Sequence, residues 1–172
     1  MQHETAGDRS GNPTKTRPGS GHAVCVPADI DTDLVIAGRY LRTRDRSLWA
    51  AHVFEDLDPA LAPRLQGAVI VAGKNFGCGS SREQAAIAIR EAGAIAVIAP
   101  SFARIFFRNA INIGLPLIEA DISCSDGSLV RFSLDEGWVE SGGRRYAIRP
   151  LSPRMREILT AGGLVEYWRL HP

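Results

Sequence analysis

Two short apolar runs, separated by a glycine-rich segment and a helical pattern, restrict the fold of this chain more than any other feature. Residues 68–71 and 94–99 are apolar throughout and are typical of buried strands. Residues 81–92 carry apolar side chains almost all round the central part of a helix, which indicates burial on more than one side. A strand, a helix and a second strand in this order predict a βαβ unit with parallel strands.

The segments on either side extend this unit to an α/β domain. We expect a short strand at 23–26, a helix over 102–113 with Ser101 as its cap, and a third apolar strand at 115–118. Beyond Asp121, alternating runs predict an antiparallel meander over 130–134, 138–140 and 144–148.

The ends of the chain and one internal segment have weaker patterns. A last helix is expected from Ser152 to the residue before Gly162. Residues 47–66 are interpreted as weak helix and loop that connect and pack. Residues 1–21 are rich in Gly, Pro, Ser, Thr and charge without a hydrophobic period, and we expect a disordered extension there. Residues 22–172 are then a single domain.

The segment 73–83, which joins the first apolar run to the helix, reads Gly-Lys-Asn-Phe-Gly-Cys-Gly-Ser-Ser-Arg-Glu. Ligands of open α/β sheets bind at the carboxyl ends of strands, and the first N–H groups of a helix attract anions. The segment therefore predicts a site for a small acid, with backbone donors at Gly77, Cys78 and Gly79 and side-chain donors at Ser80, Ser81 and Arg82.

The same residues allow other interpretations. Ser80 and Ser81 would serve equally as an ordinary helix cap. A nucleotide P-loop is disfavoured because no Lys-Ser or Lys-Thr pair follows the glycines. Cys78 lacks a histidine nearby in the sequence, which argues against a nucleophilic thiol and favours a packing role.

Composition narrows the partners and the compartment. The chain has 20 basic and 19 acidic residues and no basic stripe, so nucleic acid is not expected as a partner. No apolar run is long enough to cross a membrane, and none resembles a signal peptide. The three cysteines, Cys25, Cys78 and Cys124, form no Cys-x-x-Cys pair, and a reducing cytoplasm is the expected location.

Three ordered motifs resemble the aconitase family: Asp31-Thr32-Asp33, the segment 73–82, and Ser-Phe-Ala-Arg-Ile-Phe-Phe-Arg-Asn at 101–109. More narrowly, the chain resembles the small subunits of the 3-isopropylmalate dehydratase and homoaconitase type. The resemblance implies a swivelling β/β/α domain that docks on a large subunit. That subunit would carry a 4Fe-4S cluster whose iron acts as Lewis acid, with no metal on this chain. Gln84 departs from the histidine that many bacterial members have after Ser-Ser-Arg-Glu.

The resemblance also implies roles for individual residues in a hydro-lyase that dehydrates and rehydrates a small hydroxy-carboxylic acid. Ser80 matches the catalytic base, Ser81 and Arg82 match ligands of the substrate carboxylate, and Thr32 and Asp33 are expected on the substrate side of the site. Arg42 lies where relatives acting on tricarboxylates place an arginine.

Two questions stay open from the sequence. If Arg42 points inward, it favours homoaconitate; if it points outward, Leu41 or Tyr40 lines the pocket and isopropylmalate or citramalate fits. A non-catalytic carboxylate-binding module is the alternative of a different class.

Overall fold

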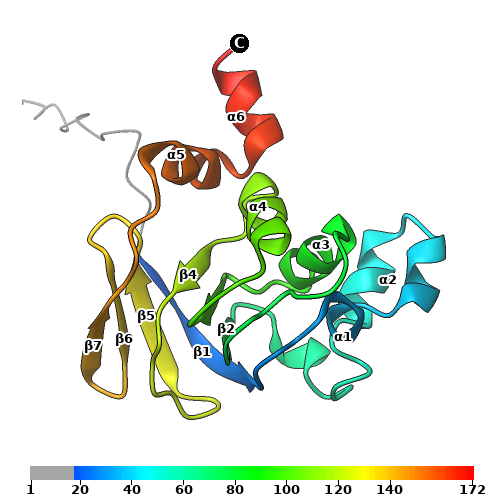
Figure 1. Cartoon of the computed structure of the whole chain (residues 1–172), viewed down its shortest axis with the longest axis horizontal. Helices are drawn as coiled ribbons and strands as arrows, with labels where there is room; N and C mark the ends of the chain where they lie inside the picture. Colours follow the sequence, from blue (N-terminus) through cyan, green and yellow to red (C-terminus); the bar gives the residue numbers. More distant parts are fainter. Residues whose placement is uncertain (1–17) are drawn as a thin grey trace, which may run out of the picture.

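The computed structural model describes residues 18–172, so residues 1–17 of the expected extension lie outside the described part of the chain. A seven-stranded sheet with the order β4-β3-β2-β1-β5-β6-β7 forms the centre of the molecule (Figure 1). Its strands are β1 (Gly19–Val26), β2 (Val69–Ala72), β3 (Ala96–Ala99), β4 (Leu117–Glu119), β5 (Leu129–Ser133), β6 (Trp138–Ser141) and β7 (Arg144–Ala147).

Helices connect the strands on one side of the sheet and close the chain at its C-terminal end. The α-helices are α1 (Thr32–Val35), α2 (Arg46–Ala51), α3 (Glu83–Glu91), α4 (Arg104–Asn112), α5 (Pro153–Ala161) and α6 (Leu164–Leu170). Two 3-10 helices, η1 (Gly38–Arg42) and η2 (Ala62–Arg64), lie in the segment between β1 and β2. The expected βαβ unit is confirmed as β2, α3 and β3, because β2 and β3 pair in parallel.

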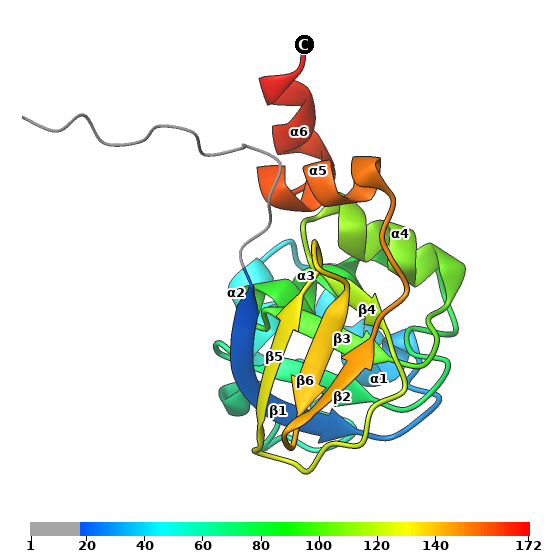
Figure 2. The same cartoon turned by 90° about the vertical axis from the view of Figure 1, so that its left-hand side faces the viewer.

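Strand β1 joins the parallel and the antiparallel parts of the sheet. Residues 19–22 pair with β5 in antiparallel register, and residues 23–26 pair with β2 in parallel register. Strands β2, β3 and β4 continue the parallel part, whereas β5, β6 and β7 form the expected antiparallel meander. The sheet curls at β1, so that the meander lies over one face of the parallel strands (Figure 2).

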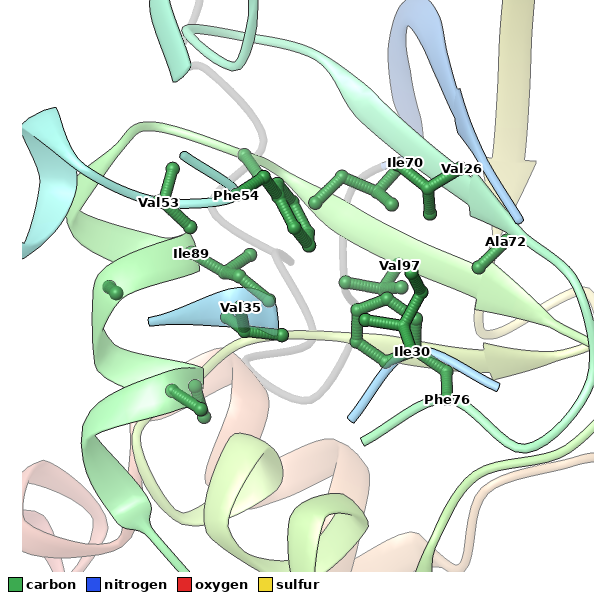
Figure 3. Close-up of a cluster of buried hydrophobic side chains, with 14 of the residues drawn as sticks. Val26, Ile30, Val35, Val53, Phe54, Ile70, Ala72, Phe76, Ile89 and Val97 are labelled. Atoms are coloured by element: carbon green, nitrogen blue, oxygen red, sulfur yellow. The ribbon is translucent and has the colours of Figure 1, made fainter. Parts of the chain in front are cut away.

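The parallel strands are buried on both faces, which explains their uninterrupted apolar sequences. On β2, Ile70 and Ala72 point into a core shared with the helices, whereas Val69 and Val71 point into a second core under the meander. Figure 3 shows the first core, where Ile89 of α3 lies among Val35, Val53 and Phe54. The molecule therefore has three layers: the meander, the parallel strands and the helices.

The main differences from the sequence-based expectations concern β1, α4 and α6. Strand β1 begins at Gly19 rather than Ala23, because its first residues hydrogen bond with β5, a partner that is distant in the sequence. Ser101 does not cap α4; the cap is Ala103, and the Ser101 hydroxyl instead accepts a hydrogen bond from the N–H of Asn75 at 2.9 Å. An additional helix, α6, follows the Gly162-Gly163 pair.

Candidate active site

The glycine-rich loop after β2 and the segment after β1 lie side by side, because β1 and β2 are adjacent parallel strands and their carboxyl ends meet at one edge of the sheet. The Gly77 N–H donates to the carbonyl of Ile30 at 2.7 Å, and the Thr32 N–H donates to the carbonyl of Cys78 at 2.9 Å. Asp31 caps α1 by accepting from the N–H groups of residues 33 and 34. These bonds bring the two polar motifs of the sequence together.

Phe76 anchors the beginning of the glycine-rich loop. Its buried ring makes edge-to-face contacts with Phe54, Phe102 and Phe106, with ring centroids 5.3–6.5 Å apart. Its backbone N–H donates to Ser101, and its carbonyl accepts from the N–H of Ala103. The loop therefore starts from a fixed point in the core.

Gly77 continues the loop in a conformation that suits only glycine. Its φ is +78°, and a Cβ atom there would lie 2.2 Å from Cγ of Phe106. The sequence-based expectation that Gly77 donates to a ligand is wrong, because its N–H is already bound to Ile30. Gly77 instead allows the loop to lie directly on the core.

Ser80 is exposed, and its hydroxyl lies beside Thr32. The two side-chain oxygens are 3.0 Å apart, and the Ser80 N–H donates to Thr32 Oγ1 at 3.2 Å. The Thr32 residue is only 1% exposed. The expectation that Thr32 lies on the substrate side is therefore corrected: its hydroxyl is directed to Ser80.

Ser81 and Arg82 follow Ser80 at the entrance to α3. Ser81 is exposed, and its carbonyl accepts from the side-chain amide of Asn109 at 3.4 Å. The Arg82 guanidinium donates to the Asp33 carboxylate, so these two expected site residues form an ion pair in the isolated chain. Their side chains are 32% and 60% exposed, which leaves further guanidinium donors open to solvent.

The first turn of α3 has unused hydrogen-bond donors. Arg82 is the N-cap residue and makes no side-chain capping bond, so the alternative reading of Ser80 and Ser81 as ordinary caps is wrong. Within residues 18–172, the N–H groups of Gly79, Ser81 and Arg82 have no hydrogen-bond partner. Donors of this kind at a helix N-terminus are suited to binding an anion.

Cys78 lies in the same loop but is not activated as a nucleophile. Partial burial, followed by the nearby carboxylates of Asp31 and Asp29, raises the pKa of the Cys78 thiol above its ordinary value. A raised pKa keeps the thiol protonated at neutral pH, and the thiolate is the reactive form. Its sequence-based interpretation as a packing residue agrees with this environment.

Arg42 ends η1, and the residues around it are held by a polar cluster that sequence reasoning missed. Glu55 accepts hydrogen bonds from the Tyr40 hydroxyl and from the Arg39 guanidinium, the latter at 2.7 Å. His52 stacks on Tyr40 with ring centroids 4.1 Å apart and lies 3.1 Å from Glu55. The acidic group at 55–58 and the Arg-Tyr pair at 39–40 were the available signal.

The side chains of Tyr40, Leu41 and Arg42 in η1 have different surroundings. Tyr40 is occupied with Glu55 and His52, and Leu41 packs against the core that the helices cover. The Arg42 side chain is exposed, and within the described residues it makes no hydrogen bond or ion pair. Of the three residues considered from the sequence, Arg42 is the one with its polar group free.

The chain matches the family described as the aconitase C-terminal domain over residues 19–121. The chain belongs to this family. The methanogen homoaconitase small subunit of Methanothermobacter thermautotrophicus is 49% identical over 143 residues, covering 81% of this chain and 84% of that relative. The 3-isopropylmalate dehydratase small subunit of Moorella thermoacetica is 50% identical over 145 residues, covering 81% and 87%.

A solved structure of this aconitase-type fold is also similar. The crystal structure of 3-isopropylmalate dehydratase from Methanocaldococcus jannaschii superposes with a TM-score of 0.86 at 45% identity, covering 90% of this chain and 95% of that one. The recognition of an aconitase-type small subunit and its swivelling β/β/α fold is therefore confirmed. No helix in the described part of the chain is long and apolar enough to cross a membrane.

Proposed function

We propose that this chain is the small subunit of a hydro-lyase of the 3-isopropylmalate dehydratase type. With a large subunit, it would isomerise a 2-hydroxy di- or tricarboxylic acid by dehydration and rehydration, in the cytoplasm. The observation that carries the proposal is the exposed Ser80 hydroxyl with unpaired backbone donors on both sides of it. An open site of this kind is incomplete without a second surface to cover it.

Ser80 is the base that removes a proton from the carbon next to a substrate carboxylate. A serine can do so only as an alkoxide, which needs hydrogen-bond donors placed in advance. The free N–H groups of Ser81 and Arg82 follow directly in the chain and are available for this purpose. The positive end of the α3 dipole adds to the same effect.

Arg82, Ser81 and Asp33 form the substrate side of the site. The Arg82 guanidinium binds a substrate carboxylate and keeps Asp33 as its second partner, because arginine has more donors than the one that Asp33 uses. The Ser81 hydroxyl is exposed and adds a neutral donor beside it. The backbone N–H groups of Cys78 and Gly79 complete the anion site.

We infer that the free Arg42 guanidinium faces the substrate and favours an acid with an extra carboxylate, such as homoaconitate. A free guanidinium next to an isopropyl group would lose solvation without gaining a partner. Isopropylmalate and citramalate remain the alternatives, since relatives named for the dehydratase and for homoaconitase are equally similar to this chain.

The iron–sulfur cluster of such an enzyme would belong to the large subunit and would act there as a Lewis acid. Within residues 18–172, no three His, Cys, Asp or Glu side chains converge to hold a metal ion. The described residues therefore offer no set of ligands for a cluster. On α4, next to the site loop, Ile105 is 53% exposed between Arg104 and Arg108, and we propose this face as part of the docking surface.

The test is turnover of the chain co-expressed anaerobically with the large subunit encoded beside it, on isopropylmalate, homoaconitate and citraconate. Ser80→Ala is expected to lower kcat by roughly 10²- to 10⁴-fold, the usual contribution of a general base. Ser125→Ala removes an exposed hydroxyl that makes no side-chain hydrogen bond, and it serves as the matched control. Near-normal turnover by Ser80→Ala would refute the base assignment. Wild-type inactivity on all three acids would favour the carboxylate-binding module.

A further inference from the structure

Thr32 is buried, and within the described residues every hydrogen-bond contact of its hydroxyl is to Ser80. Three atoms of Ser80 lie around Thr32 Oγ1: the backbone N at 3.2 Å, Oγ at 3.0 Å and the carbonyl oxygen at 3.5 Å. The two residues are 48 positions apart in the sequence. Such a concentration of contacts on one residue needs an explanation beyond packing.

Counting hydrogen atoms fixes the direction of one of these bonds and limits the others. A threonine hydroxyl carries one hydrogen and can accept two more bonds. The Ser80 N–H can only donate, so Thr32 accepts there and keeps its own hydrogen for another partner. Ser80 Oγ is the nearer of the two remaining acceptors.

The backbone of Thr32 is held in place independently of Ser80. Its N–H donates to the carbonyl of Cys78 at 2.9 Å, and its carbonyl accepts from the N–H of Ile36 at 3.1 Å. Asp31 caps the helix that Thr32 begins. The residue is 1% exposed, so water does not compete for its hydroxyl. The hydroxyl is therefore in position before any ligand arrives.

We propose that Thr32 is a positioning residue that orients Ser80 and donates its hydroxyl hydrogen to Ser80 Oγ whenever that oxygen is an alkoxide. The proposal rests on the proposed function, in which Ser80 is the base. An alkoxide has no hydrogen to donate, so Thr32 is then the donor of the 3.0 Å contact. Thr32 keeps its proton throughout: the proton taken from the substrate passes to Ser80 Oγ and is later returned from there.

Two groups of donors surround Ser80. The N–H groups of Ser81 and Arg82 come from the same loop and move with it, whereas Thr32 belongs to a different segment. A donor fixed on another element restricts the rotation of the Ser80 side chain and also stabilises the negative charge of its alkoxide. Removal of this donor should raise the pKa of the Ser80 hydroxyl, because a donor stabilises the alkoxide more than the neutral hydroxyl.

The test compares Thr32→Val and Thr32→Ser in the assembled enzyme. Thr32→Val keeps the shape but lacks the hydroxyl, and a bond to a charged group is worth about 10- to 100-fold. We therefore expect kcat to fall roughly 10- to 100-fold, and the rising limb of the pH profile of kcat/KM to move up by about one to two units. Thr32→Ser should restore both quantities to near the wild-type values. KM should change much less than kcat.

Ser141→Ala is the matched control, because Ser141 is also buried and its hydroxyl donates to the Ser123 carbonyl in the meander, which contributes no residue to the proposed site. It should leave the pH profile unchanged. If Thr32→Val does not fold or assemble, Thr32→Ala replaces it, because alanine also lacks the hydroxyl and is smaller than valine.

Two results would overturn the inference. One is a folded, assembled hydroxyl-free variant with wild-type kcat and pH profile. The other is a Thr32→Ser variant as impaired as Thr32→Val, since the hydroxyl alone would then not account for the effect. High activity of Ser80→Ala would instead overturn the proposed function itself, so the two failures are distinguishable.

Discussion

Gly77→Ala should destabilise the isolated chain far more than its backbone conformation alone would require. Two costs add at this position. A left-handed φ costs an alanine about 1–2 kcal/mol relative to glycine, and Gly77 has φ +78°. The new Cβ would also lie 2.2 Å from Cγ of Phe106, which no real Cβ contact permits. Overpacking of this kind costs about 1–3 kcal/mol.

Phe106 has little freedom to move away from an added methyl group. It is 2% exposed, and its ring lies 5.3 Å from that of Phe76, which is itself enclosed by the core. The sum for Gly77→Ala is therefore about 2–5 kcal/mol. This is a large part of the free energy of unfolding of an ordinary domain.

Gly127→Ala is a control that carries the cost of the left-handed φ without the cost of overpacking. Gly127 has φ +77°, nearly the value at Gly77, but a Cβ there would meet no atom within 4 Å. Urea denaturation followed by circular dichroism measures both variants. With a slope of about 2 kcal/mol per molar urea, Gly77→Ala should unfold roughly 0.5–1.5 M earlier than Gly127→Ala. Equal midpoints for the two variants would refute the claim that the core dictates a glycine at this position.

Two further predictions concern titratable groups. The Tyr40 hydroxyl and the Arg39 guanidinium lower the pKa of Glu55 to about 2 from an ordinary value of 4.5. The lowered pKa of Glu55 means that its carboxylate stabilises the fold above pH 4.5. This contribution to stability is lost as the pH falls toward 2. Glu55→Gln should thus be less stable than wild type at pH 7, with a difference in urea midpoint that shrinks below pH 4.5; a constant difference would contradict this. Burial, together with Cys124 and Asp126, raises the pKa of Cys25 to about 11. Iodoacetamide should therefore modify Cys25 slowly at about pH 8 in the folded chain and quickly in denaturant; equal rates by mass spectrometry would contradict the burial.

The comparison of sequence and structure shows which features follow from local patterns. The βαβ unit could be recognised because strands buried on both faces are apolar throughout, and the meander because its runs alternate. Ser80, Ser81 and Arg82 could be singled out because their chemistry follows a glycine-rich turn at the end of a strand. These features depend on neighbouring residues alone.

Features that depend on distant contacts could not be read in this way. The sequence predicts the wrong cap for α4 because Ser101 hydrogen bonds with the loop after β2. It predicts too short a β1 because the first residues of that strand pair with β5. The sequence around Glu55 indicates only a connecting and packing segment, since nothing local shows that Tyr40 and Arg39 converge on this carboxylate.

The sequence by itself determined the chemistry of the glycine-rich loop, the order of the main strands and helices of the chain, and the family to which the chain belongs. Only the tertiary structure decided which groups are free to act. In the tertiary structure the Gly77 N–H donates to the Ile30 carbonyl and is not free. Arg82 forms an ion pair with Asp33, and the Thr32 hydroxyl contacts Ser80. The physical reason is the parallel pairing of β1 with β2, whose register brings the segments after both strands to one edge of the sheet.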